Sequence, residues 1–315
     1  MAPGGPVVLI TGCSDGGIGA ELCIAFKQLA GADVFATARS MQSMAALKPL
    51  GIHTLQLDVT RSADIKAAVA TVIQQAGRLD ILVNNAGKGM VGPLAEIPLA
   101  SARHAFDTNV WGLLECCQAV VPHMAARGTG TIVNIGSVAG LVSVPWSGVY
   151  SATKFAVHAL SDALRMELAP LGIKVVVVAP GAIRSNIASN MMSGLDLSYL
   201  SLYRHYQPLI ESRVRLSQGF KSTPTRLFAQ AVVRQVLRSQ PPAYYIAGRL
   251  SWLACLLAWA LPRWLTDYLL RRQFGLRAPL PPLPLSPPQP EPQLGQEAGQ
   301  VKAGAGGAAA GLKAE

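Results

Sequence analysis

The stretch Val7–Cys23, VVLITGCSDGGIGAELC, decides the fold class because an apolar run, a glycine-rich turn and an amphipathic segment follow one another in it. Val7–Ile10 predicts a short buried strand, and Ile18–Leu29 carries apolar residues at helical spacing with polar side chains on one side. A strand that leads through glycines into a helix is a building unit of parallel sheets. The stretch therefore predicts an α/β fold.

The glycine-rich turn has two incompatible functional interpretations. Gly12–Gly16 fits the pattern G-x-S-x-G, the elbow that presents the nucleophilic serine of an α/β-hydrolase, which would be Ser14. The same turn contains Gly12, Gly17 and Gly19, which together can hold a dinucleotide's pyrophosphate at a helix N-terminus. Both interpretations require strand, turn and helix, so the rest of the chain must decide between them.

Strands and helices alternate along most of the chain. The predicted strands are Val7–Ile10, Asp33–Thr37, Ile52–Leu57, Leu79–Val83, Gly130–Gly136, Ile173–Ala179 and Tyr244–Ala247, and the predicted helices are Ile18–Leu29, Ala63–Gln75, Ser101–Ala126, Val149–Leu168 and Pro224–Ser239. Continuous Val/Ile runs are typical of parallel strands that are covered on both faces. The pattern predicts a doubly wound parallel sheet, a Rossmann fold, in a single domain over residues 1–248.

The composition indicates a folded chain without a metal site. Of 315 residues, 50% are hydrophobic and 14% are charged, which excludes a disordered protein. The five cysteines form no C-x-x-C pair and the five histidines are scattered, so we expect reduced thiols in an intracellular protein and no metal site. The N-terminal MAPGGP has no charged n-region, so no cleaved signal peptide is expected.

The positive charge is confined to one part of the chain. The net charge is +10, and residues 200–277 hold twelve Lys and Arg against two acidic residues, which accounts for the whole excess. A basic and partly apolar region suits an anionic lipid surface or a phosphorylated substrate. Nucleic acid is not expected, because no nucleic-acid-binding motif accompanies the charge.

Three regions after residue 185 depart from the alternating pattern. Residues 186–220 form an insert rich in Met, Leu and Tyr, predicted to be irregular and to bind substrate. Residues 249–276 form an apolar and basic helical segment, and residues 277–315 have the Pro, Gln, Gly and Ala repeats of a disordered tail.

The helical segment contains ten uninterrupted apolar residues, Trp252–Leu261. As a helix they span about 15 Å, half of the roughly 30 Å hydrocarbon core of a bilayer, so they cannot cross it alone. With the flanking arginines they suit a membrane-interface anchor, which predicts a peripheral location on the endoplasmic reticulum membrane or a lipid droplet. The alternative is a helix packed on the core or on a sister subunit of a cytosolic protein.

Polar and glycine motifs lie at the carboxyl ends of the predicted strands, where a doubly wound sheet binds its ligands. They are Thr11-Gly12 with Gly17-Ile18-Gly19, Asn84-Asn85-Ala86-Gly87, Asn109, Ser137, Tyr150-x-x-x-Lys154 and Pro180-Gly181. In this order and at these spacings, they resemble the short-chain dehydrogenase/reductase family over about residues 6–248. The resemblance implies an enzyme that transfers hydride between a nicotinamide cofactor and a carbonyl group.

The predicted catalytic residues are Asn109, Ser137, Tyr150 and Lys154. Tyr150 and Lys154 are one helical turn apart and project from the same face; an ammonium about 4 Å from a phenol favours the phenolate by roughly 4 kcal/mol at an effective dielectric near 20. The resemblance implies that Tyr150 is the acid/base, Lys154 also holds the nicotinamide ribose, Ser137 bonds the substrate oxygen and Asn109 supports a water-linked proton path. His158, one turn further on, fits helix packing or a subunit contact better than a proton relay.

The predicted cofactor is NADPH. Relatives that prefer NAD place an acidic residue after the second strand, whereas this chain has Arg39, which suits a 2′-phosphate. The predicted cofactor-binding set is Gly12, Ser14, Gly17, Ile18, Gly19, Arg39, Asp58, Val59, Asn85, Ala86, Gly87, Tyr150, Lys154, Pro180, Gly181, Ile183 and Ser185.

Two stretches narrow the substrate. The glycine loop TGCSDGGIG is one residue longer than the usual family form, and with PGAIRSNI at Pro180–Ile187 it resembles the 1-acyldihydroxyacetone-phosphate reductases. That resemblance implies a ketone substrate that carries an acyl chain and a phosphate. The apolar insert would bind the acyl chain, and Arg204, Arg213 and Arg215 would bind the phosphate. A steroid or retinoid reductase, which needs no arginine for a phosphate, is the closest alternative.

Two alternatives lie outside the reductases. One is a serine hydrolase, such as a lipase, that uses Ser14; the other is a non-catalytic scaffold, against which the intact set of four catalytic residues argues. Helices Ser101–Ala126 and Val149–Leu168 match those that pair subunits in the family, so the resemblance also implies a homo-oligomer.

Overall fold

The computed structural model describes residues 4–215 and 222–276, and within them seven parallel strands form one sheet. The strands are β1 (Val7–Thr11), β2 (Asp33–Ala38), β3 (His53–Gln56), β4 (Ile81–Asn84), β5 (Gly130–Ile135), β6 (Ile173–Pro180) and β9 (Tyr244–Ala247). Their order is β3-β2-β1-β4-β5-β6-β9, and every pairing is parallel. The predicted doubly wound sheet is confirmed.

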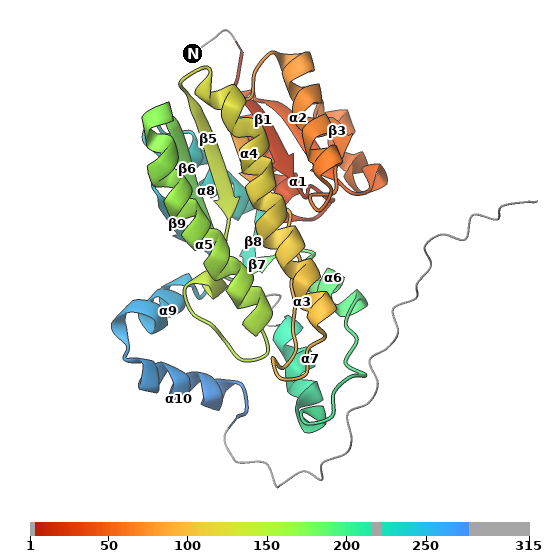
Figure 1. Cartoon of the computed structure of the whole chain (residues 1–315), viewed down its shortest axis with the longest axis vertical. Coiled ribbons are helices and arrows are strands. Elements are labelled where there is room, and N and C mark those ends of the chain that lie inside the picture. Colours follow the sequence, from red (N-terminus) through yellow and green to blue (C-terminus); the bar gives the residue numbers. More distant parts are fainter. Residues whose placement is uncertain (1–3, 216–221, 277–315) are drawn as a thin grey trace, which may run out of the picture. The chain divides into compact units, whose positions relative to one another are not determined.

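Helices cover both faces of the sheet (Figure 1). One face carries α1 (Ile18–Ala30), α8 (Thr225–Val236) and the 3-10 segment η1 (Met41–Leu50), and the other carries α2 (Ser62–Ala76), α4 (Gly112–Ala125) and α5 (Gly148–Leu168). Alternate residues of a strand point to opposite faces, so Val8 and Ile10 enter one core and Val7 and Leu9 the other. Two hydrophobic cores therefore fix the sheet between two helical layers.

The predicted helix Ser101–Ala126 is interrupted. It consists of α3 (Leu99–Phe106), the π-helical turn η2 (Asp107–Trp111) and α4. The π turn holds Asn109, whose side chain accepts a hydrogen bond from Lys88 N (2.7 Å) and donates one to Lys88 O (2.9 Å). Single π turns occur mostly at functional sites, and this one directs Asn109 to the loop after β4.

The prediction that residues 186–220 are irregular is wrong for those that the structure describes. They form α6 (Ile187–Ser193), the 3-10 turn η5 (Arg204–Tyr206) and α7 (Gln207–Arg215), while residues 216–220 lie outside the described part. The insert has its own apolar cluster, which includes Trp146, Leu200, Ile210 and Val214. Helices form here because this cluster gives their apolar faces a place to pack. Two short strands, β7 (Ile183–Arg184) and β8 (Thr223–Pro224), pair at its base.

The C-terminal segment forms two short helical pieces joined by a turn. The first is α9 (Ser251–Cys255) with the π segment η7 (Leu256–Ala260), and the second is α10 (Arg263–Gln273). Pro262 ends the first piece because it cannot donate a backbone hydrogen bond. Thr266 Oγ1 then donates to Leu257 O at 3.1 Å and ties α10 to η7. The predicted tail, residues 277–315, lies outside the described residues. Two 3-10 turns, η3 (Val138–Gly140) and η4 (Ala169–Leu171), complete the described elements.

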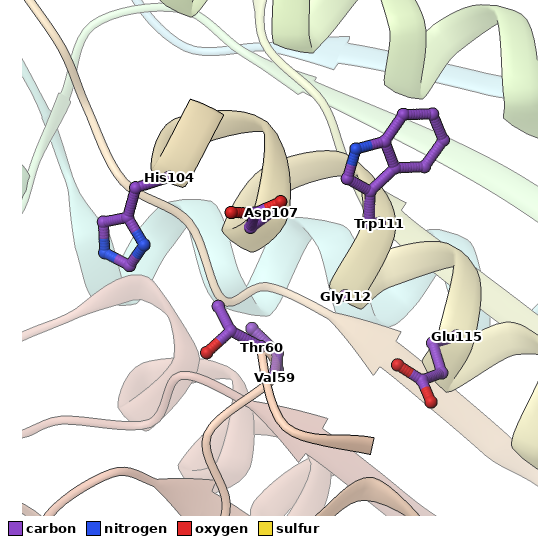
Figure 2. Close-up of a pocket in the computed structure, with 7 residues that line it drawn as sticks. All are labelled: Val59, Thr60, His104, Asp107, Trp111, Gly112 and Glu115. Carbon is purple, nitrogen blue, oxygen red and sulfur yellow. The ribbon is translucent and has the colours of Figure 1, made fainter. Parts of the chain in front are cut away.

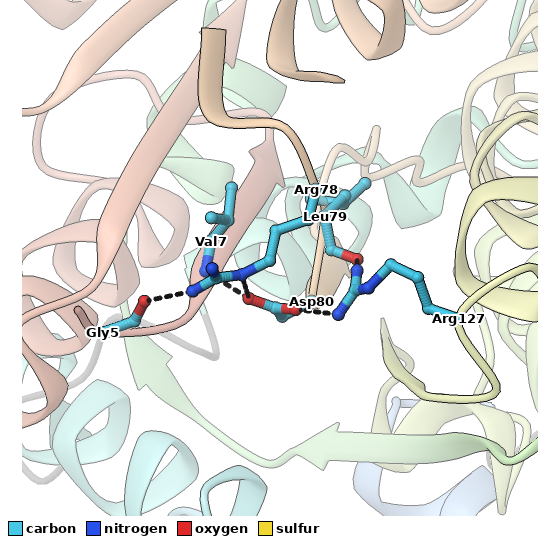
Figure 3. A network of polar contacts seen from close by, with 6 residues as sticks. All are labelled: Gly5, Val7, Arg78, Leu79, Asp80 and Arg127. Carbon is cyan, nitrogen blue, oxygen red and sulfur yellow. Dashed lines mark hydrogen bonds and ion pairs between the residues drawn. The ribbon is translucent and has the colours of Figure 1, made fainter. Parts of the chain in front are cut away.

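An ionic network holds the amino-terminal ends of β1 and β4 together (Figure 3). The Asp80 carboxylate accepts hydrogen bonds from Val7 N (2.9 Å), from Arg78 Nε (2.8 Å) and from Arg127 Nη2. Arg78 also donates to Gly5 O at 3.1 Å. Because the ligands of such a sheet bind at its carboxyl edge, this network serves the fold and not the site.

Candidate active site

The first part of the site is the turn between β1 and α1, which packs against the loop after β4. Gly12 has φ +72°, and a Cβ there would lie 2.7 Å from Ala86 Cα, so this position requires glycine. Asn85 Nδ2 donates to Thr11 O and Gly12 O, both at 2.9 Å. Thr11 Oγ1 in turn accepts the N–H groups of Asn85 (3.1 Å) and Ala86 (3.0 Å). Four predicted motif residues are thereby locked into one rigid edge.

The N-terminus of α1 opens onto this edge. The helix begins at Ile18 after the N-cap Gly17, and no side chain caps it. A Cβ on Gly17 would lie 2.9 Å from Ser14 O, and one on Gly19 would lie 2.5 Å from Gly12 O, so the loop closes tightly only around glycines. An uncapped helix start with a glycine-lined approach fits the pyrophosphate of a dinucleotide.

The longer glycine loop connects three parts of the molecule. Gly16 has φ +74°, and beside it Asp15 N donates to Ser43 O of η1 at 2.7 Å. Asp15 O accepts a hydrogen bond from Asn186 Nδ2 of the insert at 2.6 Å. The Ser14 hydroxyl lies 3.2 Å from the Ser43 hydroxyl. Its hydrogen-bond partner is a serine and not a histidine, so the general base that a serine hydrolase needs does not contact Ser14 in the described structure.

Arg39 and Asp58 lie together at the ends of β2 and β3. Burial raises the pKa of Asp58, but hydrogen bonds from Thr60 and the charges of Arg39 and His104 more than offset it, so the pKa lies below its usual value. The Asp58 carboxylate accepts from Thr60 N (3.0 Å) and Thr60 Oγ1 (2.8 Å). Arg39 itself is exposed, which leaves its guanidinium accessible to a phosphate.

A cavity of about 310 Å³ lies beside this end of the site (Figure 2). Val59 is the one predicted cofactor residue that lines it, and its other walls come from Thr60 and from α3, η2 and α4, including His104 and Trp111. The four predicted catalytic residues do not line it. The cavity therefore borders the predicted adenine side and not the reacting centre.

The second part of the site is formed by α5 and the loop after β5. Lys154 is buried and donates from Nζ to Ile135 O at 2.8 Å, and its Nζ lies 5.8 Å from the centre of the Tyr150 ring. Burial lowers the pKa of Lys154 to about 8. A Cβ on Gly87 would lie 3.5 Å from Asn109 Oδ1 and 3.8 Å from Lys154 Nζ. The structure thus brings Asn109, Lys154 and Tyr150 to one place, as predicted.

The expectation that Lys154 lowers the pKa of Tyr150 is wrong in this structure. Burial, the largest effect, raises the pKa of Tyr150, while a hydrogen bond with Ser137 and the charge of Arg213 oppose the shift. The ammonium of Lys154 donates to Ile135 O and lies 5.8 Å from the centre of the Tyr150 ring, and burial of the phenol outweighs the effects that favour the phenolate. A raised pKa keeps the Tyr150 hydroxyl protonated at neutral pH, the form that can donate a proton.

His158 positions Ser137, a role that the sequence did not reveal. Ser137 N points to His158 Nε2 at 3.4 Å, and a Cβ on Gly136 would lie 2.2 Å from the same nitrogen. Burial and the charge of Lys154 lower the pKa of His158 to about 4, with Asp162 opposing, so the ring is neutral. His158 is buried, which fits the expected packing within the fold, and it also accepts a hydrogen bond from the backbone of Ser137.

Arg213 is the arginine of the insert whose charge acts on Tyr150. It comes from α7. Its Nε is buried and has no hydrogen-bond partner among the residues that the structure describes, and its guanidinium lies 6.0 Å from the Phe274 ring. Arg204 is exposed and its Nε donates to Leu200 O at 3.4 Å, within the insert. The side chain of Arg215 lies outside the described part of the chain.

The remaining predicted cofactor residues follow β6. Gly181 N donates to Ala247 O at 2.8 Å, and a Cβ on Gly181 would lie 2.3 Å from Arg249 O, so β9 holds this turn closely. Ile183 is buried and Ser185 is half-buried in the turn that leads into the insert. Pro180 is the last residue of β6, at the carboxyl edge of the sheet. Their roles toward the nicotinamide remain predictions.

The family follows from comparison with known sequences. The model of the short chain dehydrogenase family matches residues 6–196, and this chain belongs to that family. It is 37% identical over 271 residues to a short-chain dehydrogenase of Penicillium ochrochloron, a match that covers 85% of this chain and 98% of the relative. The predicted class of enzyme is thereby confirmed.

Two relatives with named activities also match. An NADPH-dependent 1-acyldihydroxyacetone phosphate reductase of Schizosaccharomyces pombe is 35% identical over 207 residues, covering 64% of this chain and 69% of the relative. A 3-ketodihydrosphingosine reductase of Bacteroides thetaiotaomicron is 31% identical over 277 residues, covering 86% and 98%.

Solved structures show the same fold. A short-chain dehydrogenase from Streptomyces avermitilis superimposes with a TM-score of 0.72 at 29% identity, covering 88% of this chain and all of that chain. A serine dehydrogenase complexed with NADP+ in its closed form superimposes with a TM-score of 0.67 at 26% identity, covering 78% of this chain and 95% of that chain.

Proposed function

We propose that this short-chain dehydrogenase reduces the ketone of 1-acyldihydroxyacetone phosphate to give 1-acylglycerol 3-phosphate, a step of glycerolipid synthesis. The observation that carries the proposal is the position of Arg213, a cation whose charge acts on Tyr150 and whose buried Nε has no hydrogen-bond partner within residues 4–215 and 222–276. A buried donor without a partner is costly, and a bound anion would remove that cost.

The cofactor of this oxidoreductase is NADP(H). The uncapped N-terminus of α1 suits the pyrophosphate, and Arg39 at the end of β2 is exposed beside Asp58, where a 2′-phosphate would meet a guanidinium. We expect NADPH to be used in strong preference to NADH. Arg39→Ala should remove most of that preference and leave kcat with saturating NADPH close to that of the wild type.

The residues of the chain supply the proton chemistry of the reduction. When bound, NADPH supplies the hydride that goes to the ketone carbon. The Tyr150 hydroxyl, kept protonated by its raised pKa, donates its proton to the ketone oxygen, so the carbonyl becomes a secondary alcohol. Ser137 bonds with Tyr150 and can also bond the ketone oxygen, while Lys154 provides positive charge beside the phenolate that remains.

The insert supplies two further features that fit a phosphorylated lipid. Its apolar cluster places Leu200, Ile210 and Val214 together, and Met191 and Met192 pack against this cluster. Methionines fit flexible apolar chains well because their side chains adapt in shape. Arg213 lies on the same insert, so one element would hold both the acyl chain and the phosphate.

The test is an NADPH-oxidation assay with four ketones: palmitoyl-dihydroxyacetone phosphate, the same compound without phosphate, 3-ketodihydrosphingosine and a steroid ketone. The phosphorylated ketone should have the highest kcat/KM. Arg213 disfavours binding of 3-ketodihydrosphingosine, because the ammonium group of that lipid would be repelled by the guanidinium of Arg213. If the amine or the steroid has the highest kcat/KM, the proposed substrate is wrong.

A matched pair of variants separates the role of Arg213 from a general loss of structure. Arg213→Ala should lower kcat/KM for the phosphorylated ketone roughly 10- to 100-fold relative to the ketone without phosphate, since hydrogen bonds to charged groups contribute about 1.5–3 kcal/mol. Arg204→Ala removes an exposed arginine of the same insert and should leave that ratio unchanged. Tyr150→Phe should abolish turnover of all four ketones.

A further inference from the structure

The two C-terminal helical pieces expose large aromatic side chains to solvent. Trp252, Trp259 and Trp264 are 68%, 67% and 71% exposed, and Leu256 and Tyr268 are exposed as well. We call these five residues the aromatic surface. Burying apolar area stabilises a fold by about 25 cal/mol per Å². Three tryptophans that stay exposed to water contribute little of this stabilisation to the folded chain. Such a surface indicates a partner that covers it.

The spacing of these residues shows that the exposure is organised. Trp252, Leu256 and Trp259 are four and three residues apart in the first helical piece, and all three are exposed, so they belong to its solvent-facing side. Trp264 and Tyr268 are four residues apart on α10. The opposite sides carry the buried residues Ala254 and Thr266, by which the two pieces pack inward. Each piece is therefore amphipathic, with its aromatic side facing outward.

The charge around the aromatic surface is positive. Residues 249–276 contain Arg249, Arg263, Arg271 and Arg272 against the single acidic residue Asp267. Arg263 and Arg271 are exposed next to the exposed tryptophan and tyrosine of α10. Tryptophan and tyrosine favour the boundary between water and hydrocarbon, and arginines beside them attract anionic headgroups.

We propose that the aromatic surface docks this enzyme onto the surface of an anionic lipid bilayer. The helical pieces lie in the headgroup boundary and do not cross the membrane, since no helix within residues 4–215 and 222–276 has the length and hydropathy of a membrane span. The turn at Pro262 breaks the segment into two pieces that can both lie flat in the interface. The proposal concerns binding and holds whichever ketone the enzyme reduces.

The docking segment is continuous with the substrate insert. Phe274 and Leu276, which follow α10, pack against the apolar cluster of the insert. The ring of Phe274 lies 6.0 Å from the guanidinium of Arg213, whose charge acts on Tyr150. A side chain at Gly275 would meet Leu209 of α7 at 2.5 Å. A lipid that leaves the bilayer at α10 therefore meets the insert next, which suits an enzyme whose substrate has an acyl chain.

The competing occupant is a second copy of this chain, which would cover the same aromatic side chains. A copy cannot account for the charge, because two aromatic surfaces that pair across a dimer would bring the arginines of both together. An anionic bilayer neutralises them. Charge complementarity thus favours the lipid, and the experiment distinguishes the two.

The test is flotation of the full chain with vesicles of phosphatidylcholine alone and with vesicles that also contain phosphatidylserine. The wild type should float with the anionic vesicles and bind the neutral ones far less. Trp259→Ser with Trp264→Ser should weaken binding at least tenfold, and Arg263→Glu with Arg271→Glu should weaken it by roughly fivefold or more per arginine on anionic vesicles only. The matched control is Met166→Ser, which removes a large apolar side chain that is 65% exposed on α5, outside the aromatic surface.

Three results would overturn the proposal. The first is that the wild type stays in the soluble fraction, and the second is that the double variants float as well as the wild type. The third is that the tryptophan variant changes from dimer to monomer in light scattering while its flotation is unchanged. Turnover of a short-chain water-soluble ketone by each variant verifies folding. Because flotation does not depend on turnover, a failed substrate proposal and a failed docking proposal give different results.

Discussion

Asn186 Nδ2 donates a 2.6 Å hydrogen bond to Asp15 O and so joins the substrate insert to the glycine loop of the cofactor site. The bond is made in the lengthened part of the loop, beside Gly16, which adopts φ +74° and whose added Cβ would lie 3.0 Å from Asn186 Nδ2. The lengthened glycine motif therefore has a structural consequence: the loop that holds the pyrophosphate also contacts the insert that would hold the lipid.

Asn186→Ala should weaken NADPH binding about fivefold, because one hydrogen bond that orders the loop contributes about 1 kcal/mol. Binding is measured by fluorescence titration of NADPH with the purified protein. Ser212→Ala is the control, since it removes an exposed hydrogen bond to Leu209 O within α7 and should not change the NADPH affinity. Equal affinities of all three proteins would show that the contact does not order the loop.

Lys154→Met should stabilise the protein while it abolishes turnover. The pKa of Lys154 is lowered from 10.5 to about 8 by burial, so the folded state binds its proton less well than the unfolded state. Stability is therefore lost as pH falls from about 10.5 to about 8, and at pH 7 the charged side chain costs about 3 kcal/mol. Loss of the bond to Ile135 O offsets part of this cost. Denaturant unfolding should show a net gain of about 1–3 kcal/mol at pH 7 and a flatter pH dependence above pH 8.

His158→Gln should reduce the acid sensitivity of the fold. In the unfolded chain the imidazole titrates near pH 6.5, whereas burial and the charge of Lys154 lower its pKa to about 4 in the folded protein. Proton uptake thus favours the unfolded state as pH falls from 6.5 to 4, by up to about 3 kcal/mol. The variant should lose stability less steeply across this range in thermal unfolding. If the variant loses stability with falling pH as steeply as the wild type, His158 is protonated at the same pH in the folded and unfolded states. Since Ser137 N points to His158, kcat should fall as well.

The sheet and the catalytic residues could be predicted from the sequence because both depend on local patterns. Apolar strand runs and glycine turns gave all seven strands of the sheet to within two residues at each end, and the third strand, His53–Gln56, is one residue shorter at each end than the predicted Ile52–Leu57. The π turn at Asp107–Trp111 could not be predicted, because it depends on a contact between Asn109 and Lys88 that the helical periodicity does not encode.

The environment of the site was less predictable than its residues. The spacing of Tyr150 and Lys154 correctly places them on one helix face, but which group each charge faces depends on distant parts of the chain. Lys154 is directed to Ile135 O, and the cation that acts on Tyr150 is Arg213, 63 positions away in an insert predicted to be irregular. Short-range spacing cannot reveal such contacts.

Asp80→Asn should destabilise the fold without changing the chemistry of the site. The variant weakens the acceptor for Arg78 and Arg127 at the amino-terminal edge of the sheet and should lower the free energy of unfolding by about 2–4 kcal/mol. Burial raises the pKa of Asp80, but Val7 N and the two arginines lower it overall, so the wild type loses this stabilisation as pH falls below the usual range of an aspartate.

The matched control is Asp33→Asn, which changes an exposed carboxylate that lies 3.0 Å from His53 Nε2 and should cost less than about 1 kcal/mol. Both variants should keep the wild-type kcat at a temperature at which they are folded, because both aspartates lie away from the carboxyl edge of the sheet. If Asp80→Asn costs no more than Asp33→Asn, the partly buried network does not stabilise the sheet. If Asp80→Asn lowers kcat while the protein is folded, the amino-terminal edge of the sheet influences the active site through β1 and β4. The sheet would then not be a rigid support for the site.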